Sequence, residues 1–296
     1  MLDLIDRMGE KHDSKVDGNT TELNLAATTT TPAPVIIVVD KHGKGNFKTI
    51  NKAINAIPQG SKRRYIIRVN PGTYKELVKI PQEKGPITLQ GSGARKTKIT
   101  YNLDADKPGG STLKSASVSI KSDYFIAKDI SFENTSPSPD PGAVGKQAVA
   151  LEISDFIFGN GHSYYEDCTL ESVAKTFGSL AAQKRLSKSE DTGYSFVDCK
   201  VKGTGYLYLS RAWGPYSRVV FIRTYFADII RPEGWYNWGV PGREKTVFYG
   251  EYKCFGPGAN RKGREVWSYE LSDKQVKPFL TVDWIDGKDW LPKGKQ

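Results

Sequence analysis

A similar phrase recurs along most of the chain, and it restricts the possible folds more than any other feature. Each copy opens with aromatic or β-branched residues, carries a short polar or charged insertion and ends in a turn. The copies start 25 to 40 residues apart, at Tyr124, Tyr164, Tyr194, Val219 and Thr246. Self-similarity at such a period is typical of a solenoid. Because the copies are rich in strand-forming residues, they predict a parallel β-helix in which each copy supplies one coil.

The segments before the first copy fit the same scheme. A strand is predicted from Val35, and further strands follow at YIIRV, LVKI and ITLQ. Isoleucine and alanine recur at helical spacing over Thr49–Ile57, which predicts a short helix ended by Pro58 and Gly60. The phrase GTYKE, Gly72–Glu76, is interpreted as a tight turn before a strand. An antiparallel sandwich is the alternative fold, but it would need shorter and more regular turns.

The first 34 residues are polar and end in the low-complexity run TTTTPAP. Such a segment buries too little apolar surface to fold, so residues 1–34 are predicted to be a disordered arm. Residues 35–296 are predicted to form a single β-helix domain. The start of the chain lacks the apolar segment of a secretory signal. No run approaches the ~18 apolar residues that span a bilayer, so no membrane association is expected.

The net charge of +10 is spread along the chain. It suggests an extended polyanion as partner, such as nucleic acid, an anionic polysaccharide or a membrane surface, although a solvated basic surface explains the charge equally well. The three cysteines are too few for a disulfide scaffold. Cys168 and Cys199 occupy the same place in successive copies, within disulfide range on neighbouring coils, but we expect buried thiols. Three histidines without clustered ligands predict no metal site.

Two phrases carry side chains suited to chemistry. The stretch QAVALEISDFIFGNG, Gln147–Gly161, places the amide of Gln147 and the carboxylate of Asp155 in an apolar run. A buried carboxylate is costly unless it is paired, so Asp155 is a candidate for chemistry, against the alternative of an ordinary turn residue. In the second phrase, Arg211 and Trp213 are two residues apart and should share one face of a strand. A guanidinium beside an indole suits an anionic sugar.

These phrases together resemble the plant pectinesterase (pectin methylesterase) family, and the likeness extends from about Val35 to Trp290. In two places the sequence departs from the family pattern, since Ser210 stands where the family usually has Gly and Ala212 where many members have Pro. The resemblance implies a right-handed parallel β-helix. The matching strings are GTYKE, FENTSP, QAVAL, DFIFGNG, AAQKR, LSRAWGPYSR, GWYNWG and EYKCFGPGA.

The resemblance also implies a reaction, the hydrolysis of galacturonate methyl esters in pectin without a metal or another cofactor. Carried over by motif, Asp155 is the nucleophile and Arg211 keeps its carboxylate ionised and oriented. Trp213 stacks on the sugar, and Gln147 binds substrate and donates to the oxyanion. The implied partner is methyl-esterified homogalacturonan. We expect a monomer in the extracellular cell wall, with no nucleic acid as partner.

One family motif is absent. The family has a QDTL motif between QAVAL and DFIFG, which supplies an oxyanion donor and the general acid, whereas here QAVALEIS runs straight into DFIFG. In an extended chain, Gln147 and Asp155 would lie about 26 Å apart. Loss of a general acid typically costs ~10²–10⁴-fold in rate, and nothing in the spacing selects Glu152, Glu166 or Asp167 as a replacement. We therefore expect weak or no activity, with a non-catalytic pectin-binding or polyanion-binding β-helix as the alternative.

Overall fold

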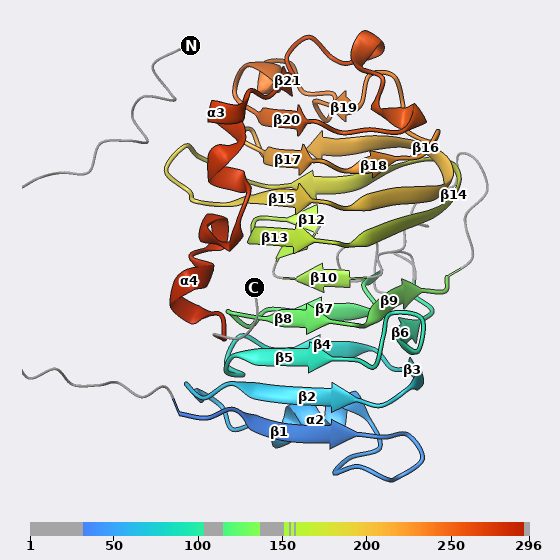
Figure 1. Ribbon diagram of the computed structural model, residues 1–296, viewed down its shortest axis with the longest axis vertical. Helices are drawn as coiled ribbons and strands as arrows, with labels where there is room; N and C mark the ends of the chain where they lie inside the picture. The colour runs from blue at the N-terminus through green and yellow to red at the C-terminus, as the bar shows by residue number, and fades with distance from the viewer. Residues whose placement is uncertain (1–31, 104–114, 137–150, 154, 157, 293–296) are drawn as a thin grey trace, which may run out of the picture. The chain divides into compact units, whose positions relative to one another are not determined.

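The first four recurring phrases each form a strand, a sharp corner and the start of a second strand, and the fifth forms a strand and a corner (Figure 1). At the corner one residue takes a left-handed backbone conformation, with φ between 46° and 54° in Asp129, Asp167, Asp198, Arg223 and Lys253. One such residue redirects the chain into the next sheet. The structure is a computed structural model that describes residues 32–103, 115–136, 151–153, 155–156 and 158–292.

The first set of coils is built from three parallel sheets. The strands follow one another in register, so that Ile37 pairs with Ile67, and Ile67 pairs with Leu89. In stacking order the sheets contain β1 (Val35–Val39), β2 (Tyr65–Val69), β5 (Ile87–Gln90) and β8 (Ile126–Lys128); β3 (Gly72–Lys75), β6 (Thr97–Tyr101) and β9 (Ser131–Asn134); and β4 (Val78–Ile80), β7 (Val118–Ile120) and β10 (Leu151–Ile153).

The second set of coils continues with two larger sheets. One contains β13 (His162–Glu166), β15 (Gly193–Val197), β17 (Arg218–Ile222), β20 (Phe248–Tyr252) and β21 (Tyr269–Glu270). The long strands of the other sheet bend, and in β16 the positive φ angles of Gly203 and Gly205 permit this. That sheet contains β11 (Asp155–Phe156), β12 (Phe158–Gly159), β14 (Thr169–Gln183), β16 (Lys200–Ala212), β18 (Tyr225–Phe226) and β19 (Trp235–Tyr236).

The interior of the second set confirms the predicted stacking of the repeats. Tyr165, Phe196 and Phe221 come from successive copies, and their rings stack with centroids 4.5 Å apart at each step. Cys168 and Cys199 precede strand residues that pair in register, and both are free thiols. The fold is the expected parallel β-helix, because identical positions of successive phrases lie above one another.

The ladder is interrupted between the two sets. Within the described residues, no strand from β1 to β10 pairs with a strand from β11 to β21. The phrase DFIFG, expected to continue an extended apolar run, instead reverses direction, since β11 and β12 are antiparallel and Asp155 pairs with Gly159. Among the residues whose burial is described, which leave out 137–158, the buried apolar residues form one cluster from Ile37 to Ile120 and two clusters that begin after Gly161.

A short helix, α2 (Ile50–Ala56), lies at the first end of the stack, where the sequence predicted it. Thr49 caps it, and the carboxylate of Glu76 accepts hydrogen bonds from the backbone N–H groups of Ile50 and Asn51. The phrase that contains Glu76 was expected to form a turn, but Gly72–Lys75 is strand β3. Its role is structural, because Glu76 satisfies donors that the helix itself leaves free.

The C-terminal segment runs back along the outside of the coils. It consists of α3 (Asp273–Val276), the 3₁₀ turns Lys277–Phe279 and Val282–Ile285, and α4 (Gly287–Trp290). Trp284 packs edge-on against His162 of β13, and Trp290 lies 5.3 Å from the ring of Tyr124 in the first set of coils. The segment therefore contacts both sets. Within the described part of the chain, no helix is long and apolar enough to cross a membrane.

Candidate functional site

The register of the second set places Arg211 and the DFIFG phrase in one sheet. Arg211 of β16 pairs with Ala182 of β14, which pairs with Phe158 of β12. Asp155 lies one strand further, in β11. At ~4.8 Å per strand, the backbones of Asp155 and Arg211 are about three strand spacings, or roughly 14 Å, apart. Gln147 lies outside the described residues, so its role as a substrate-binding residue and oxyanion donor stays a prediction.

Arg211 and Trp213 share one face, as their spacing predicted, although Trp213 is one residue past the end of β16. The link between them is Trp238. The guanidinium of Arg211 lies 4.7 Å from the Trp238 ring, and Trp213 stacks on the same ring at 6.3 Å with an interplanar angle of 16°. The ammonium of Lys184 lies 4.8 Å from the centroid of the Trp213 ring. Two stacked indoles therefore lie between two cations.

The group continues along β16. Tyr236 pairs in register with Arg211, and its ring stacks on Tyr208 at 5.2 Å. The guanidinium of Arg231 lies 4.8 Å from the Tyr208 ring and 5.3 Å from the Tyr206 ring. We call this surface the aromatic–cation strip, and it consists of Lys184, Tyr206, Tyr208, Arg211, Trp213, Arg231, Tyr236 and Trp238.

The strip faces outward because the neighbouring residues of β16 fill the core; the alternation is interrupted once, where Leu209 and Ser210 are both buried. Leu207 and Leu209 are buried, whereas Tyr206 is 44% exposed and Tyr236 is 37% exposed. Burial lowers the pKa of the Arg211 guanidinium from its usual value, but an arginine stays charged in a protein. The strip therefore offers aromatic faces and fixed positive charges side by side. Such a surface suits a sugar chain that carries carboxylates.

The buried side chain of Gln183, from the AAQKR phrase, holds the turns beside the strip. Its Oε1 accepts hydrogen bonds from the backbone N–H groups of Arg185 and Arg218, at 3.0 Å each. Its Nε2 donates to Thr192 and to Asn160, the residue after DFIFG. One amide thus fixes three segments that end at this side of the sheet. The sequence reasoning quoted this residue within a motif but assigned it no role.

Of the carboxylates considered as replacement acids, Glu166 and Asp167 lie elsewhere, whereas the side chain of Glu152 is outside the described part of the structure. Glu166 and Asp167 are exposed at the corner where β13 meets β14, at the opposite end of β14 from Gln183. Glu190 lies nearer to the DFIFG phrase. Its carboxylate accepts hydrogen bonds from the backbone N–H of Leu186 and from the side-chain amide of Asn160, the residue after that phrase. These bonds lower the pKa of Glu190, so it is ionised at neutral pH and is poorly suited to donate a proton.

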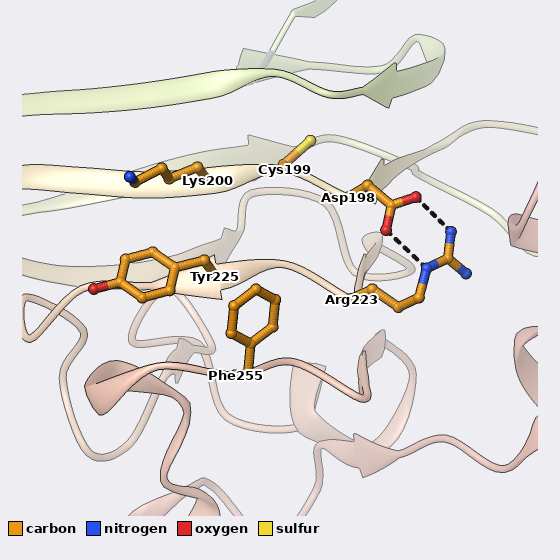
Figure 2. A pocket seen from close by; sticks show the side chains of 6 residues that line it. All are labelled: Asp198, Cys199, Lys200, Arg223, Tyr225 and Phe255. Carbon is orange, nitrogen blue, oxygen red and sulfur yellow. Dashed lines mark hydrogen bonds and ion pairs between the residues drawn. The ribbon is translucent and has the colours of Figure 1, made fainter.

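A separate pocket lies at the start of β16 (Figure 2). On one side Arg223 donates two hydrogen bonds to the carboxylate of Asp198, at 2.7 and 2.5 Å. The rings of Tyr225 and Phe255 form another side, 5.6 Å apart. Two of its residues, Asp198 and Arg223, are corner residues with positive φ, and their charges pair with one another. We therefore assign this pocket to the construction of the corner.

Six residues of the strip were not predicted from the sequence, namely Lys184, Tyr206, Tyr208, Arg231, Tyr236 and Trp238. A signal existed for two of them. Tyr236 and Trp238 are two residues apart in GWYNWG, the same spacing that singled out Arg211 and Trp213. Tyr206 and Tyr208 lie only five and three residues before Arg211 in the same strand, whereas Lys184 and Arg231 are distant in sequence and join the strip only when the coils stack.

Comparison with known proteins identifies the family. The family model described as Pectinesterase matches residues 36–154 and 152–288. "Probable pectinesterase 8" of Arabidopsis thaliana is 40% identical over 299 residues, which cover 86% of this chain and 76% of the relative. "Pectinesterase QRT1" of the same plant is 41% identical and covers 86% and 78%. The solved "Pectin methylesterase from Carrot" is 28% identical, with a TM-score of 0.71 over 86% of this chain and 94% of the other.

The two matched pieces of the family model meet at residues 152–154, directly before Asp155. The alignment with the first relative is 299 residues long although it covers only 86% of a 296-residue chain, so that relative has residues without a counterpart here. Matches of this extent, together with the fold, establish the relationship. The chain belongs to the pectinesterase family.

Proposed function

We propose that this chain binds pectin along the aromatic–cation strip and hydrolyses its galacturonate methyl esters. The observation that carries the proposal is the contact of indoles and phenols with Lys184, Arg211 and Arg231 on one outward face, in a chain of this family. Homogalacturonan offers sugar faces for the rings and carboxylates for the cations. The dispersed net charge of +10 favours the approach of such a polyanion.

The proposed reaction uses Asp155 as nucleophile. Its carboxylate oxygen bonds to the ester carbonyl carbon, the bond to the methoxy oxygen breaks, and methanol leaves after it gains a proton. Water then hydrolyses the resulting anhydride and releases the galacturonate carboxylate. Arg211 would keep the attacking carboxylate ionised, Trp213 would hold the sugar, and Gln147 would donate to the oxyanion. These roles follow from the motifs.

We further propose that the reaction is slow. The proton for methanol must come from an acid, and the family motif that supplies it is missing from the sequence. Two observations at the same place support the loss of a layer of coil, namely the break in the ladder of the described strands and the junction of the family-model matches. The loss of the general acid and the loss of one oxyanion donor each lower the rate by at least about 10²-fold. The second candidate function, a pectin-binding protein without turnover, rests on the same observations.

Methanol release and pectin binding separate these possibilities. The chain and the carrot enzyme are assayed side by side on methylated pectin, together with the Asp155→Asn variant of this chain. We expect binding that survives the Asp155→Asn change, and methanol release at least about 10²-fold slower than that of the carrot enzyme. The residual rate should vanish in the variant.

The outcomes discriminate clearly. A rate equal to that of the carrot enzyme would show that the general acid has been replaced. A chain that binds pectin and releases no methanol would be the non-catalytic binder. Failure to bind pectin would contradict both functions. We also propose that the protein works as a monomer in the cell wall, which size-exclusion chromatography and a fluorescent fusion in plant tissue would test.

A further inference from the structure

Arg231 stands out within the strip because its guanidinium lies between two phenol rings. Its backbone N–H donates to the carbonyl of Leu207 at 2.8 Å, which holds it beside β16. Its own carbonyl accepts a hydrogen bond from Arg264 at 3.1 Å. With the backbone fixed on both sides, the side chain lies across Tyr206 and Tyr208, at 5.3 and 4.8 Å from their centroids. Both distances are within the range of a cation–π interaction.

This environment leaves one edge of the guanidinium available. Nε donates to the carboxylate of Glu233 at 3.3 Å. Within the described residues, the structure gives the two terminal nitrogens of Arg231 no hydrogen-bonded partner. The side chain is 28% exposed. An arginine whose plane is held by aromatic rings is preorganised to bind a carboxylate through two parallel hydrogen bonds.

The position of Arg231 relative to Arg211 defines which sugar it would meet. Ile230 forms a bridge with Leu207, so Arg231 lies level with Tyr208, three residues before Arg211 along β16. At ~3.3 Å per residue this is about 10 Å along the strand. The stacked rings of Tyr208 and Tyr236 fill the interval. A sugar chain on these rings would present one unit to Arg211 and another to Arg231.

We propose that Arg231 is a specificity-determining residue that selects an unesterified galacturonate unit on the same sugar chain as the ester being processed. This inference rests on the proposed function of the strip. A free carboxylate can accept charge-assisted hydrogen bonds from the guanidinium, whereas a methyl ester offers only a neutral carbonyl. The protein would therefore bind best where pectin has already lost some of its methyl groups. Glu233 competes for the same guanidinium and limits this preference.

Binding to two oligogalacturonides of equal length tests the inference, one fully methyl-esterified and one fully de-esterified. Titration calorimetry would compare the wild-type chain with Arg231→Gln, Arg231→Lys and Glu233→Gln. For Arg231→Gln we expect about 5-fold weaker binding of the acid form. This loss lies between the contribution of an exposed ion pair and that of a buried hydrogen bond to a charged group. Binding of the ester form should change little. Lysine should restore part of the loss, and Glu233→Gln should strengthen binding of the acid form.

The outcomes keep the two proposals apart. If the wild-type chain binds neither oligosaccharide, the proposed function itself is wrong. If it binds both and Arg231→Gln leaves the ratio of the two affinities unchanged, the role of Arg231 is overturned. If Arg231→Gln only disturbed the fold, it would weaken the binding of both oligogalacturonides equally, and that outcome would also count against the proposal. Glu233→Gln retains Arg231, so unchanged binding of the acid form by this variant contradicts the inference even if Arg231→Gln fails to fold.

Discussion

At the scale of single residues, His162 is held in a site that favours its neutral form. It begins β13, its ring meets Trp284 edge-on at 4.3 Å, and its buried Nε2 makes no hydrogen bond to the described residues. Burial is the main cause that lowers the pKa of His162. The charge of Arg218 acts in the same direction, while Asp191 and Asp286 oppose it.

This lowered pKa predicts a pH-dependent stability. The unfolded chain binds a proton at His162 near pH 6.5, where the folded chain does not. The contribution to stability is therefore present above pH ~6.5 and is lost as the pH falls below it. We expect the free energy of unfolding, measured by urea denaturation between pH 7.5 and 5.5, to fall less steeply in His162→Gln. Equal slopes for wild type and variant would contradict this, and exposed His42→Gln serves as the control.

At the scale of elements, the corners explain the repeating phrase. The polar insertion in each copy supplies the left-handed residue that turns the chain from one sheet into the next. Asp129, Asp167 and Asp198 suit this conformation, because a short polar side chain can bond to its own backbone there. Arg223 and Lys253 take the same conformation without that advantage. What repeats from copy to copy is therefore the place of the left-handed residue, whereas its residue type repeats only in part.

Lys253→Asn should consequently stabilise the protein. Asparagine tolerates the left-handed conformation, and Lys253 contributes only an exposed ion pair with Asp273 at 3.7 Å and a contact with the Tyr252 ring. We expect the free energy of unfolding to rise by about 0.5–1 kcal/mol in chemical denaturation. Lys79→Asn in strand β4 is the matched control and should lower stability slightly, since asparagine is a poor strand former. A shift of the same sign in both variants would refute the explanation.

The same scale shows what the sequence could predict. The strands Tyr65–Val69 and Ile87–Gln90 have the predicted bounds, because a buried strand is a short apolar run between turn residues. The helix was predicted from the period of its apolar residues and from Pro58 and Gly60 after it. The reversal inside DFIFG was not predicted. It depends on which strand lies beside β11, and the local sequence does not contain that information. Most of the strip was missed for a similar reason, as Arg231 and Tyr206 are neighbours only through stacking.

At the scale of the whole chain from Pro34, no described strand of the first set of coils forms a hydrogen-bonded pair with a described strand of the second set. Each set has its own buried apolar cluster. The C-terminal segment provides one described link, because Trp290 contacts the ring of Tyr124 and lies 5.8 Å from the guanidinium of Arg64 in the first set. Cooperative unfolding requires strong coupling between parts, so this arrangement predicts two units with separate stabilities.

The positions of the tryptophans make this prediction measurable. All six lie at or after Trp213, in the second set or the C-terminal segment, so their fluorescence does not report directly on the first set. Circular dichroism reports on both. We expect the urea midpoints from the two signals to differ in the wild-type chain, and to differ more in Trp290→Ala, which removes the contact with Tyr124. Trp238→Ala, within the strip, should leave the separation unchanged. Coincident transitions in the wild type and in Trp290→Ala would show that the interrupted stack still unfolds as one cooperative unit.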